Sequence, residues 1–375
     1  MTMFFCGDVM VGRGVDQILR HPSGPQLHEP FVSDAREYVQ LAEATSGAVP
    51  RRALPTYVWG DALPEWEGTA PAVRVANLET SVTRRDEYCT AKSIHYRMHP
   101  WNVDCVKAAR FDVCVLANNH VLDFGRRGLV ETLETLENAG IACAGAGRTL
   151  SEARRPVVCA LPGGRRLVLA ACAHESSGVP DHWAARADRA GVHLLPDLRE
   201  ETAASLAVTL LEQKRPGDVA AVSIHWGGNW GYGVPHEHVA FAHGLVDAGV
   251  DLVHGHSSHH VRPIEIYRER LILYGCGDFL NDYEGIVGYE EYRADLALMF
   301  FPSVDVTTGR LAGLRMTPLR IRRLRLHRAS ADDARWLCDR LDRVCRPFGA
   351  RMEVAADGAL TLVHSQTTGS PFPAK

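Results

Sequence analysis

Carboxylate, amide and imidazole side chains follow six short apolar runs of the sequence, each at the point where the run ends. In chain order these residues are Asp8, Glu79, Asn118, Asn119, His120, His225, His254, His256 and Asp278. Such groups bind divalent metal ions and transfer protons near neutral pH. One or two polar residues at strand ends would mean little, but six consecutive runs that end this way indicate a site.

The apolar runs have the length and composition of strands that are buried on both faces. They cover residues 3–6, 73–76, 113–117, 220–224, 251–253 and 271–274. Helical patterns lie between them, at about 101–110, 126–139, 197–214 and 236–248. This alternation predicts an α/β fold with a largely parallel sheet, in which ligands bind beyond the carboxyl ends of the strands.

The remaining segments carry weaker patterns. Residues 20–70 are rich in Pro and Gly and predict an excursion with one helix near 34–46. Residues 157–160, 166–172, 296–301 and 314–321 are expected to form antiparallel strands of a second sheet. We expect residues 329–375 to form a C-terminal unit, with a helix at 329–345, strands at 351–354 and 360–363, and a mobile tail.

The composition is that of an ordinary globular protein, with 46% hydrophobic and 23% charged residues. Forty-one Lys and Arg against 45 Asp and Glu leave no basic field for nucleic acid or an anionic membrane. The first residues lack the basic region of a signal peptide, and no apolar window is long enough for a membrane helix. We therefore expect a cytoplasmic protein without nucleic-acid or membrane partners.

The motifs GDVM at 7–10, NLE at 77–79, NNH at 118–120, HWG at 225–227 and HGHSSHH at 254–260 together resemble the CapA family. This is the capsule or poly-γ-glutamate synthesis branch of the calcineurin-like metallophosphoesterases. KSIHYRMHP at 92–100 and YGCGDFLNDYEG at 274–285 add to the likeness, which extends over about residues 3–325. The resemblance implies a two-sheet sandwich flanked by helices over 1–328, with the metal at the carboxyl ends of the strands.

By the same resemblance the metal ligands are Asp8, Glu79, Asn119, His225 and His259. Met10 and Ser257 stand where the phosphoesterases have two further histidines, and His256 directly precedes Ser257. A thioether and a hydroxyl are poor replacements for imidazole in binding zinc or iron. The remaining, mostly oxygen, ligands favour Ca²⁺, Mg²⁺ or Mn²⁺ over Zn or Fe, and a single ion completed by waters is one arrangement. No organic cofactor is expected.

Histidines that are not needed as ligands are available as acids and bases. His120 matches the general acid of the phosphoesterases and has Asp123 three residues later. His256, His259 and His260 have Asp278 and Asp8 as candidate partners. A histidine oriented by a carboxylate is expected to have a raised pKa. Two such pairs on opposite faces of a carbon would remove and return a proton, as epimerisation at a peptide Cα requires.

Further residues are candidates for substrate binding. Lys92 and Arg97 could bind a carboxylate or phosphate, or serve only the fold. Trp226, Trp230 and Tyr232 could form an aromatic wall beside the metal or simply pack together.

Three functions compete. The first and favoured one is a metal-dependent epimerase that acts on a peptide or amino-acid substrate, such as a ribosomal precursor peptide, because the family is similar to the epimerases of lasso-peptide pathways. The second is a phosphoester hydrolase. The third is an accessory part of poly-γ-glutamate synthesis.

Overall fold

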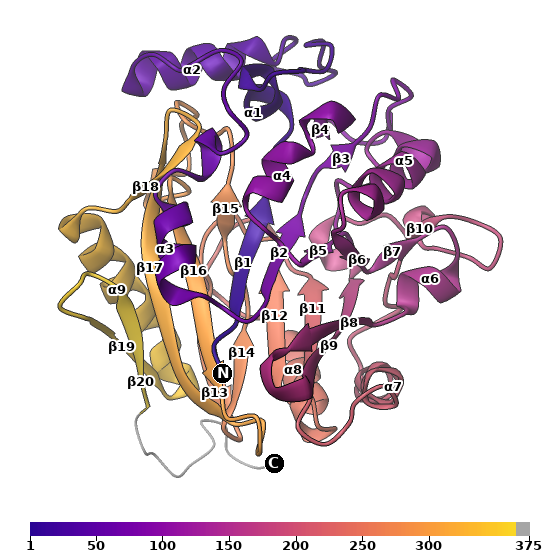
Figure 1. Ribbon diagram of the computed structural model, residues 1–375, viewed down its shortest axis with the longest axis vertical. Coiled ribbons are helices and arrows are strands. Elements are labelled where there is room, and N and C mark those ends of the chain that lie inside the picture. Colours follow the sequence, from indigo (N-terminus) through magenta and orange to yellow (C-terminus); the bar gives the residue numbers. More distant parts are fainter. Residues whose placement is uncertain (365–375) are drawn as a thin grey trace.

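The computed structural model, described here for residues 1–364, is built around two β-sheets that pack face to face (Figure 1). The larger sheet has ten strands, with the order β19-β20-β17-β16-β1-β2-β5-β6, while β15 pairs with β1 and β18 with β17. Its strands are β1 (Phe4–Val9), β2 (Arg74–Leu78), β5 (Val113–Val115), β6 (Ala142–Ala144), β15 (Asp278–Leu280), β16 (Leu296–Val304), β17 (Leu311–Arg322), β18 (Arg325–Arg328), β19 (Ala350–Val354) and β20 (Leu360–His364).

The smaller sheet has six strands in the order β13-β14-β12-β11-β9-β8. They are β8 (Val157–Leu161), β9 (Arg165–Ala173), β11 (Val219–His225), β12 (Leu252–His256), β13 (Ile264–Tyr267) and β14 (Arg270–Leu273). Two short ribbons complete the strands, and they pair β3 (Ser81–Val82) with β4 (Arg97–Met98) and β7 (Ala146–Gly147) with β10 (Gly191–Val192).

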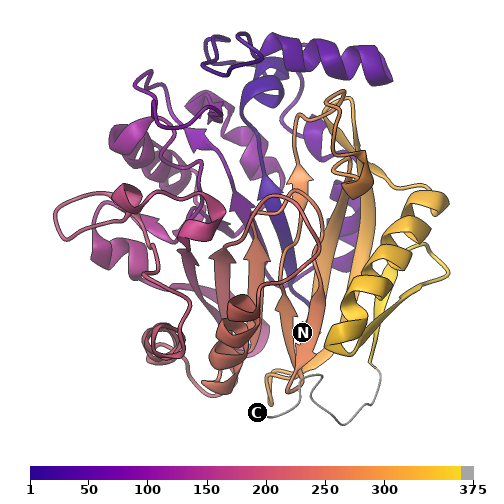
Figure 2. The same ribbon diagram turned by 180° about the vertical axis from the view of Figure 1, so that it is seen from behind.

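Helices cover the outer faces of both sheets, as Figure 2 shows from behind. They are α1 (Arg13–Ile18), α2 (Arg36–Ser46), α3 (Ala62–Thr69), α4 (Asp104–Ala108), α5 (Gly125–Asn138), α6 (Leu150–Arg154), α7 (Glu200–Leu211), α8 (His236–Asp247) and α9 (Ala331–Cys345). Strand alternation divides the core: Phe4 and Cys6 of β1 pack towards the helices, whereas Met3 and Phe5 pack between the sheets. The two-sheet sandwich flanked by helices that the resemblance implies is confirmed.

The parallel strands point their carboxyl ends to the same edge of the molecule. Strands β1, β2 and β5 run parallel in the larger sheet, and β11 and β12 run parallel in the smaller one. Figure 1 shows their arrowheads directed to the upper edge, below α1 and α2. The polar residues that follow these strands are therefore delivered to one place.

The antiparallel strands were expected in one separate sheet, and this is wrong. β8 pairs with β9 in the smaller sheet, and β16 pairs with β17 in the larger sheet, so both sheets are mixed. The excursion contains the expected helix as α2 and a second helix, α3, whose buried Trp66 packs edge-on against Phe4.

The C-terminal helix and strands form where they were expected, as α9, β19 and β20. β20 pairs with β17, so these strands extend the larger sheet. The tail at 365–375 lies outside the described residues. Among residues 1–364, none of the helices combines the length and the apolar character that crossing a bilayer requires.

Candidate metal centre

Strand ends from the larger sheet bring three of the predicted acidic residues into one buried region. The side-chain nitrogen Nδ2 of Asn77 on β2 donates to Asp8 Oδ1 at 2.8 Å and to Glu79 Oε2 at 3.1 Å. The other oxygen of Glu79 lies 3.7 Å from His120 Nε2. Asp278 on β15 is the register partner of Asp8. These carboxylates and His120 therefore share a common site.

Histidines from the smaller sheet complete two overlapping groups of metal donors. One group is Asp8, His225 and His256, and the other is Asp8, His259 and Asp278. Within each group one donor atom per residue lies within 4.8 Å of the others, and all five residues are buried. Because both groups contain Asp8, the predicted ligands His225 and His259 both lie close to Asp8.

The two positions that depart from the phosphoesterase pattern point their side chains elsewhere. Met10 Sδ accepts a hydrogen bond from the Tyr283 hydroxyl at 3.7 Å. The Ser257 hydroxyl donates to a backbone carbonyl at 3.0 Å, while its backbone N–H lies 3.3 Å from Asp8 Oδ2. Ser257 adopts a φ of +107°, which is strained for a residue other than glycine. Asp278 offers a carboxylate oxygen to the donor group that contains Asp8 and His259.

The acidic residues of this site are costly to bury as anions unless a cation accompanies them. Burial, followed by the charge of Asp278, raises the pKa of Asp8 to about 7. Burial and the nearby Asp8 also raise the pKa of Glu79 well above its usual value. A divalent cation would keep both carboxylates ionised.

Two further atoms lack the partner that a buried polar atom normally has. Among the described residues, neither His225 Nε2 nor Asn119 Oδ1 has a hydrogen-bond partner, although both atoms are buried. Each carries a lone pair that a metal ion accepts well. Of the predicted ligands, Asp8, His225 and His259 belong to the two donor groups. The donor atoms of Glu79 and Asn119 are also of a kind that suits a divalent cation.

The raised pKa of Asp8 predicts how metal binding depends on pH. A proton and a metal ion compete for the Asp8 carboxylate, so Mn²⁺ affinity should increase as the pH rises through about 7. Titration of metal-free protein with Mn²⁺ at pH values on both sides of this pKa measures the effect. An affinity that does not change over this range would contradict the assignment of Asp8 as a ligand.

His120 is held by the carboxylate that the sequence predicts for it. Asp123 Oδ2 accepts a hydrogen bond from His120 Nδ1 at 2.6 Å, and Lys92 Nζ lies 2.6 Å from Asp123 Oδ1. The expectation of a raised pKa is wrong here: burial, assisted by the charge of Lys92, outweighs Asp123 and lowers the pKa of His120 to about 4. His120 is therefore neutral near pH 7, with its Nε2 free to accept a proton.

A second histidine–carboxylate pair joins His259 to Asp278. The two groups are 2.9 Å apart, from His259 Nδ1 to Asp278 Oδ1. Although burial alone would lower it, the pKa of His259 is raised because the Asp278 carboxylate outweighs that effect. His256 instead bonds to other residues of the smaller sheet, and His260 Nδ1 bonds to the carbonyl of Val261 at 3.0 Å. Of the candidate pairings of these three histidines, His259 with Asp278 forms a hydrogen bond, and His256 Nδ1 lies 3.9 Å from Asp8 Oδ1.

The predicted substrate-binding residues do not all reach this site. Lys92 contacts the backbone oxygen of Asn119 and lies beside His120, and the Trp230 ring lies 5.3 Å from that of His259. The Tyr232 ring lies 4.6 Å from that of His260, farther along the same aromatic cluster.

Trp226 and Arg97 point elsewhere. Trp226 is buried, stacks on His238 and donates to the backbone oxygen of Tyr274, so it packs in the core. Arg97 on β4 bonds to Asp86 and lies over the Phe124 ring, 4.7 Å from its centroid.

Sequence reasoning missed the network around Arg13, which borders the site. This buried guanidinium pairs with Asp282 and Glu29 and lies over the Tyr96 ring, 4.4 Å from its centroid. Tyr96 in turn packs edge-on against His120, with ring centroids 4.4 Å apart. Arg13 lies three residues after the GDVM motif, but only the fold reveals that one of its partners, Asp282, comes from a segment far along the chain.

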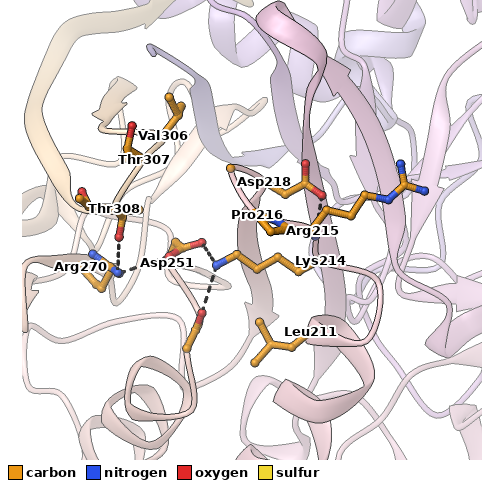
Figure 3. Close-up of a pocket in the computed structure, with 13 residues that line it drawn as sticks. Leu211, Lys214, Arg215, Pro216, Asp218, Asp251, Arg270, Val306, Thr307 and Thr308 are labelled. Atoms are coloured by element: carbon orange, nitrogen blue, oxygen red, sulfur yellow. Dashed lines mark hydrogen bonds and ion pairs between the residues drawn. The ribbon is translucent and has the colours of Figure 1, made fainter.

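A cavity of about 450 Å³ lies at the opposite, amino ends of β11 and β12 (Figure 3). Figure 3 shows two of its cations, Lys214 and Arg270, paired within the protein: Lys214 Nζ lies 2.6 Å from Asp251, and Arg270 donates to the backbone oxygen of Thr308 at 2.7 Å. Arg270 Nε also lies 3.3 Å from Asp251. Lys214, Arg270 and Asp251 satisfy one another, and none of the residues that line the cavity has a buried side-chain polar atom without a partner, in contrast to the metal centre.

Comparison with known proteins identifies the family of this chain. Residues 2–283 match the family model described as bacterial capsule synthesis protein PGA_cap. The chain is 50% identical over 364 residues to a probable polyglutamine synthesis accessory protein of Mycobacterium tuberculosis, covering 97% of this chain and 96% of the relative. It is 27% identical to the PGA biosynthesis protein CapA of Bacillus subtilis, over 86% of this chain and 72% of the relative. The chain therefore belongs to the bacterial capsule synthesis protein PGA_cap family, whose fold is metallophosphoesterase-like.

Proposed function

We propose that this protein is an accessory protein of glutamate-polymer synthesis and that its centre is a metal-dependent phosphoester hydrolase. The observation that carries the hydrolase proposal is the gathering of Asp8, Glu79, His225 and His259 at the edge where both sheets end. The polymer role is supported by the relatives, which are named for polyglutamine synthesis and for PGA biosynthesis. The epimerase that the sequence favoured finds no support in these relatives.

The protein's own groups have separate tasks in this proposal. A bound divalent cation would stabilise the negative charge that develops on a transferred phosphoryl group. His120 moves the proton: Asp123 fixes its Nδ1–H, so Nε2 is the atom that exchanges a proton with the reacting oxygen. Lys92 places a positive charge beside this pair and attracts an anionic substrate. Carboxylate and amide oxygens supply most of the donor set, so we propose Mn²⁺, Mg²⁺ or Ca²⁺ rather than zinc or iron.

Hydrolysis of p-nitrophenyl phosphate tests the enzymatic part of the proposal. We expect turnover that requires Mn²⁺ or Mg²⁺, stops on addition of a chelator and returns when the metal is restored. An Arg97→Ala variant is the control, because Arg97 belongs to the KSIHYRMHP motif but bonds to Asp86 in the structure. Absence of turnover with each of these metals would contradict the hydrolase.

The polymer role needs a test in cells that make a glutamate polymer. Loss of this protein should lower the amount of polymer, and the wild-type chain should restore it. Polymer that persists unchanged without the protein would contradict the accessory role. Restoration by a variant that cannot bind metal would show that the role does not depend on the centre.

A second candidate function is epimerisation at a Cα of a peptide or amino-acid substrate. It is favoured by one observation: two histidine–carboxylate pairs, His120 with Asp123 and His259 with Asp278, lie at the same site. Incubation of a candidate precursor peptide with the protein in D₂O should then add about one mass unit at the inverted residue. A peptide that gains no deuterium would count against this function and leave the hydrolase unaffected.

A further inference from the structure

A chain of hydrogen bonds runs through the layer between the two sheets and ends at the metal centre. It begins at the backbone oxygen of Cys6 on β1, which lies 2.9 Å from His254 Nε2. Ser223 Oγ is 2.9 Å from both His254 Nδ1 and His256 Nε2. His256 Nδ1 is 2.8 Å from His225 Nδ1. The four side chains are buried and link the larger sheet to a predicted ligand on the smaller one.

The strand period explains why these side chains form a line. Ser223 and His225 are two residues apart on β11, and His254 and His256 are two residues apart on β12, so each pair shares one face of its strand. The register pairs Ser223 with His254 and His225 with His256. The two polar residues of β11 therefore lie beside the two polar residues of β12 and form one row of four side chains.

The carbonyl of Cys6 sets the direction of every hydrogen bond in the chain, because a carbonyl oxygen only accepts. His254 must therefore donate from Nε2, which leaves its Nδ1 to accept from the Ser223 hydroxyl. The Ser223 oxygen then accepts from His256 Nε2–H, and His256 Nδ1 accepts from His225 Nδ1–H. His225 is left with a bare Nε2, which is the buried atom without a partner.

This argument needs neutral imidazoles, and the surroundings favour them. His254 contacts the Phe5 ring, Cys6 and Ser223, and none of these carries a charge. The nearest carboxylate to His256 that forms an ion-pair contact is that of Asp8, at 3.9 Å. An additional charge in this buried layer would lose its hydration without a close partner in return.

We propose that Ser223, His254 and His256 are positioning residues that hold His225 in the Nδ1–H tautomer and so present its Nε2 to the metal ion. This inference rests on the metal centre of the proposed function. It also assigns His256 to the support of His225, not to the metal. In metal sites generally, such a partner of a ligating histidine fixes the orientation of the ring and its basicity.

The competing arrangement places one ion between the Nδ1 atoms of His225 and His256. The two atoms are 2.8 Å apart, which is a hydrogen-bond distance. Neighbouring ligands of an octahedral ion at 2.0–2.1 Å would be roughly 2.9 Å apart, so the arrangements are distinguished by the other ring nitrogen of His225. An ion between the two Nδ1 atoms would leave His225 Nε2–H buried with no acceptor among the described residues. The relay satisfies every atom except the one that a metal would bind.

Long-range ¹H–¹⁵N NMR correlations of the metal-free wild-type protein test the inference directly, since they distinguish the two tautomers of each histidine. We expect His225 protonated at Nδ1 and His256 and His254 protonated at Nε2. A His225 protonated at Nε2 would overturn the relay. This measurement needs no variant, so it does not depend on whether a substituted protein folds.

A Ser223→Ala variant tests the consequence for metal binding. Removing the hydroxyl breaks the relay, so Mn²⁺ affinity should fall by about 10- to 100-fold, and the His225 signals should show both tautomers. Cys172→Ala is the matched control: it removes one buried atom on neighbouring β9 that bonds to the backbone oxygen of Ser223 and not to its hydroxyl. The control should bind Mn²⁺ like the wild type.

The result separates the relay from the metal centre itself. The Mn²⁺ affinity of each variant is measured by EPR from the concentration of free Mn²⁺. Equal affinities of the Ser223→Ala and Cys172→Ala variants would overturn the relay but leave the centre in place. A wild-type protein that binds no Mn²⁺, Mg²⁺ or Ca²⁺ would instead overturn the centre, while the tautomer spectrum would still decide whether the relay exists.

Discussion

An Asp8→Asn variant should retain the fold and lose its metal ion. Asp8 belongs to both donor groups, and its carboxylate lies between the strand ends of the two sheets. The neutral amide is a far weaker ligand, so the metal content should drop to the background level. Turnover should then fall by about 10³-fold or more, because the charge stabilisation that a metal supplies is worth several kcal/mol. Elemental analysis and p-nitrophenyl phosphate kinetics measure the two effects.

The control for this variant is Asp251→Asn. Asp251 is also a buried aspartate on the same sheet system, but it lies at the opposite strand ends, where it pairs with Lys214 and Arg270. Its substitution should leave metal content and turnover unchanged, even if the protein becomes less stable. An Asp8→Asn protein with a full complement of metal would show that Asp8 is not a ligand.

A His120→Ala variant should lose turnover while keeping its metal. We assign His120 to proton transfer because its Nδ1 is engaged by Asp123 and its Nε2 faces the carboxylate of Glu79 at 3.7 Å. Loss of a general acid or base lowers the rate by about 10²- to 10⁴-fold. The neighbouring donor atoms stay in place, so elemental analysis should give the wild-type metal content.

His193→Ala is the matched control for this second variant. His193 is likewise buried, with burial lowering its pKa to about 4, and its Nδ1 bonds to the backbone oxygen of Ala171. It should lower stability without a comparable loss of turnover per folded molecule. If His120→Ala loses metal and activity in equal proportion, His120 is a ligand and the assignment to proton transfer is wrong.

Much of the site could be predicted because its residues follow patterns that are local in the sequence. Short apolar runs followed by Asp8, Glu79, Asn119 and His225 indicate strand ends, and parallel strands bring such ends to one edge. The fold class follows from the same alternation of strands and helices. These features depend on residues that are close in sequence, so the sequence contains them.

The sequence predicts the pair of His120 with Asp123, but it could not decide which histidine pairs with Asp278. Asp278 pairs with His259 because β15 lies beside β1, and nothing in the segment around Asp278 specifies that neighbour. The lowered pKa of His120 has a similar origin, since it results from burial that only the assembled fold produces. The partition of the antiparallel strands between two sheets also depends on tertiary neighbours, and local pattern misassigned it.

The relay was missed for a further reason, although its signal is present. The spacing Ser223-x-His225 and His254-x-His256 puts polar residues on a common face of two strands that were predicted to be buried. Each residue alone is compatible with ordinary core packing. Only the register between β11 and β12 turns the two patterns into one hydrogen-bonded line.

The anchor of that line is a main-chain oxygen, which every amino acid carries. Position 6 could therefore be occupied by another apolar residue during evolution without freeing the imidazoles, and sequence comparison would not reveal its importance. What must be inherited is the placement of β1 against β12, since hydrogen bonds weaken steeply when their geometry is lost. The coordination chemistry of one sheet thus depends on how accurately the other sheet is docked.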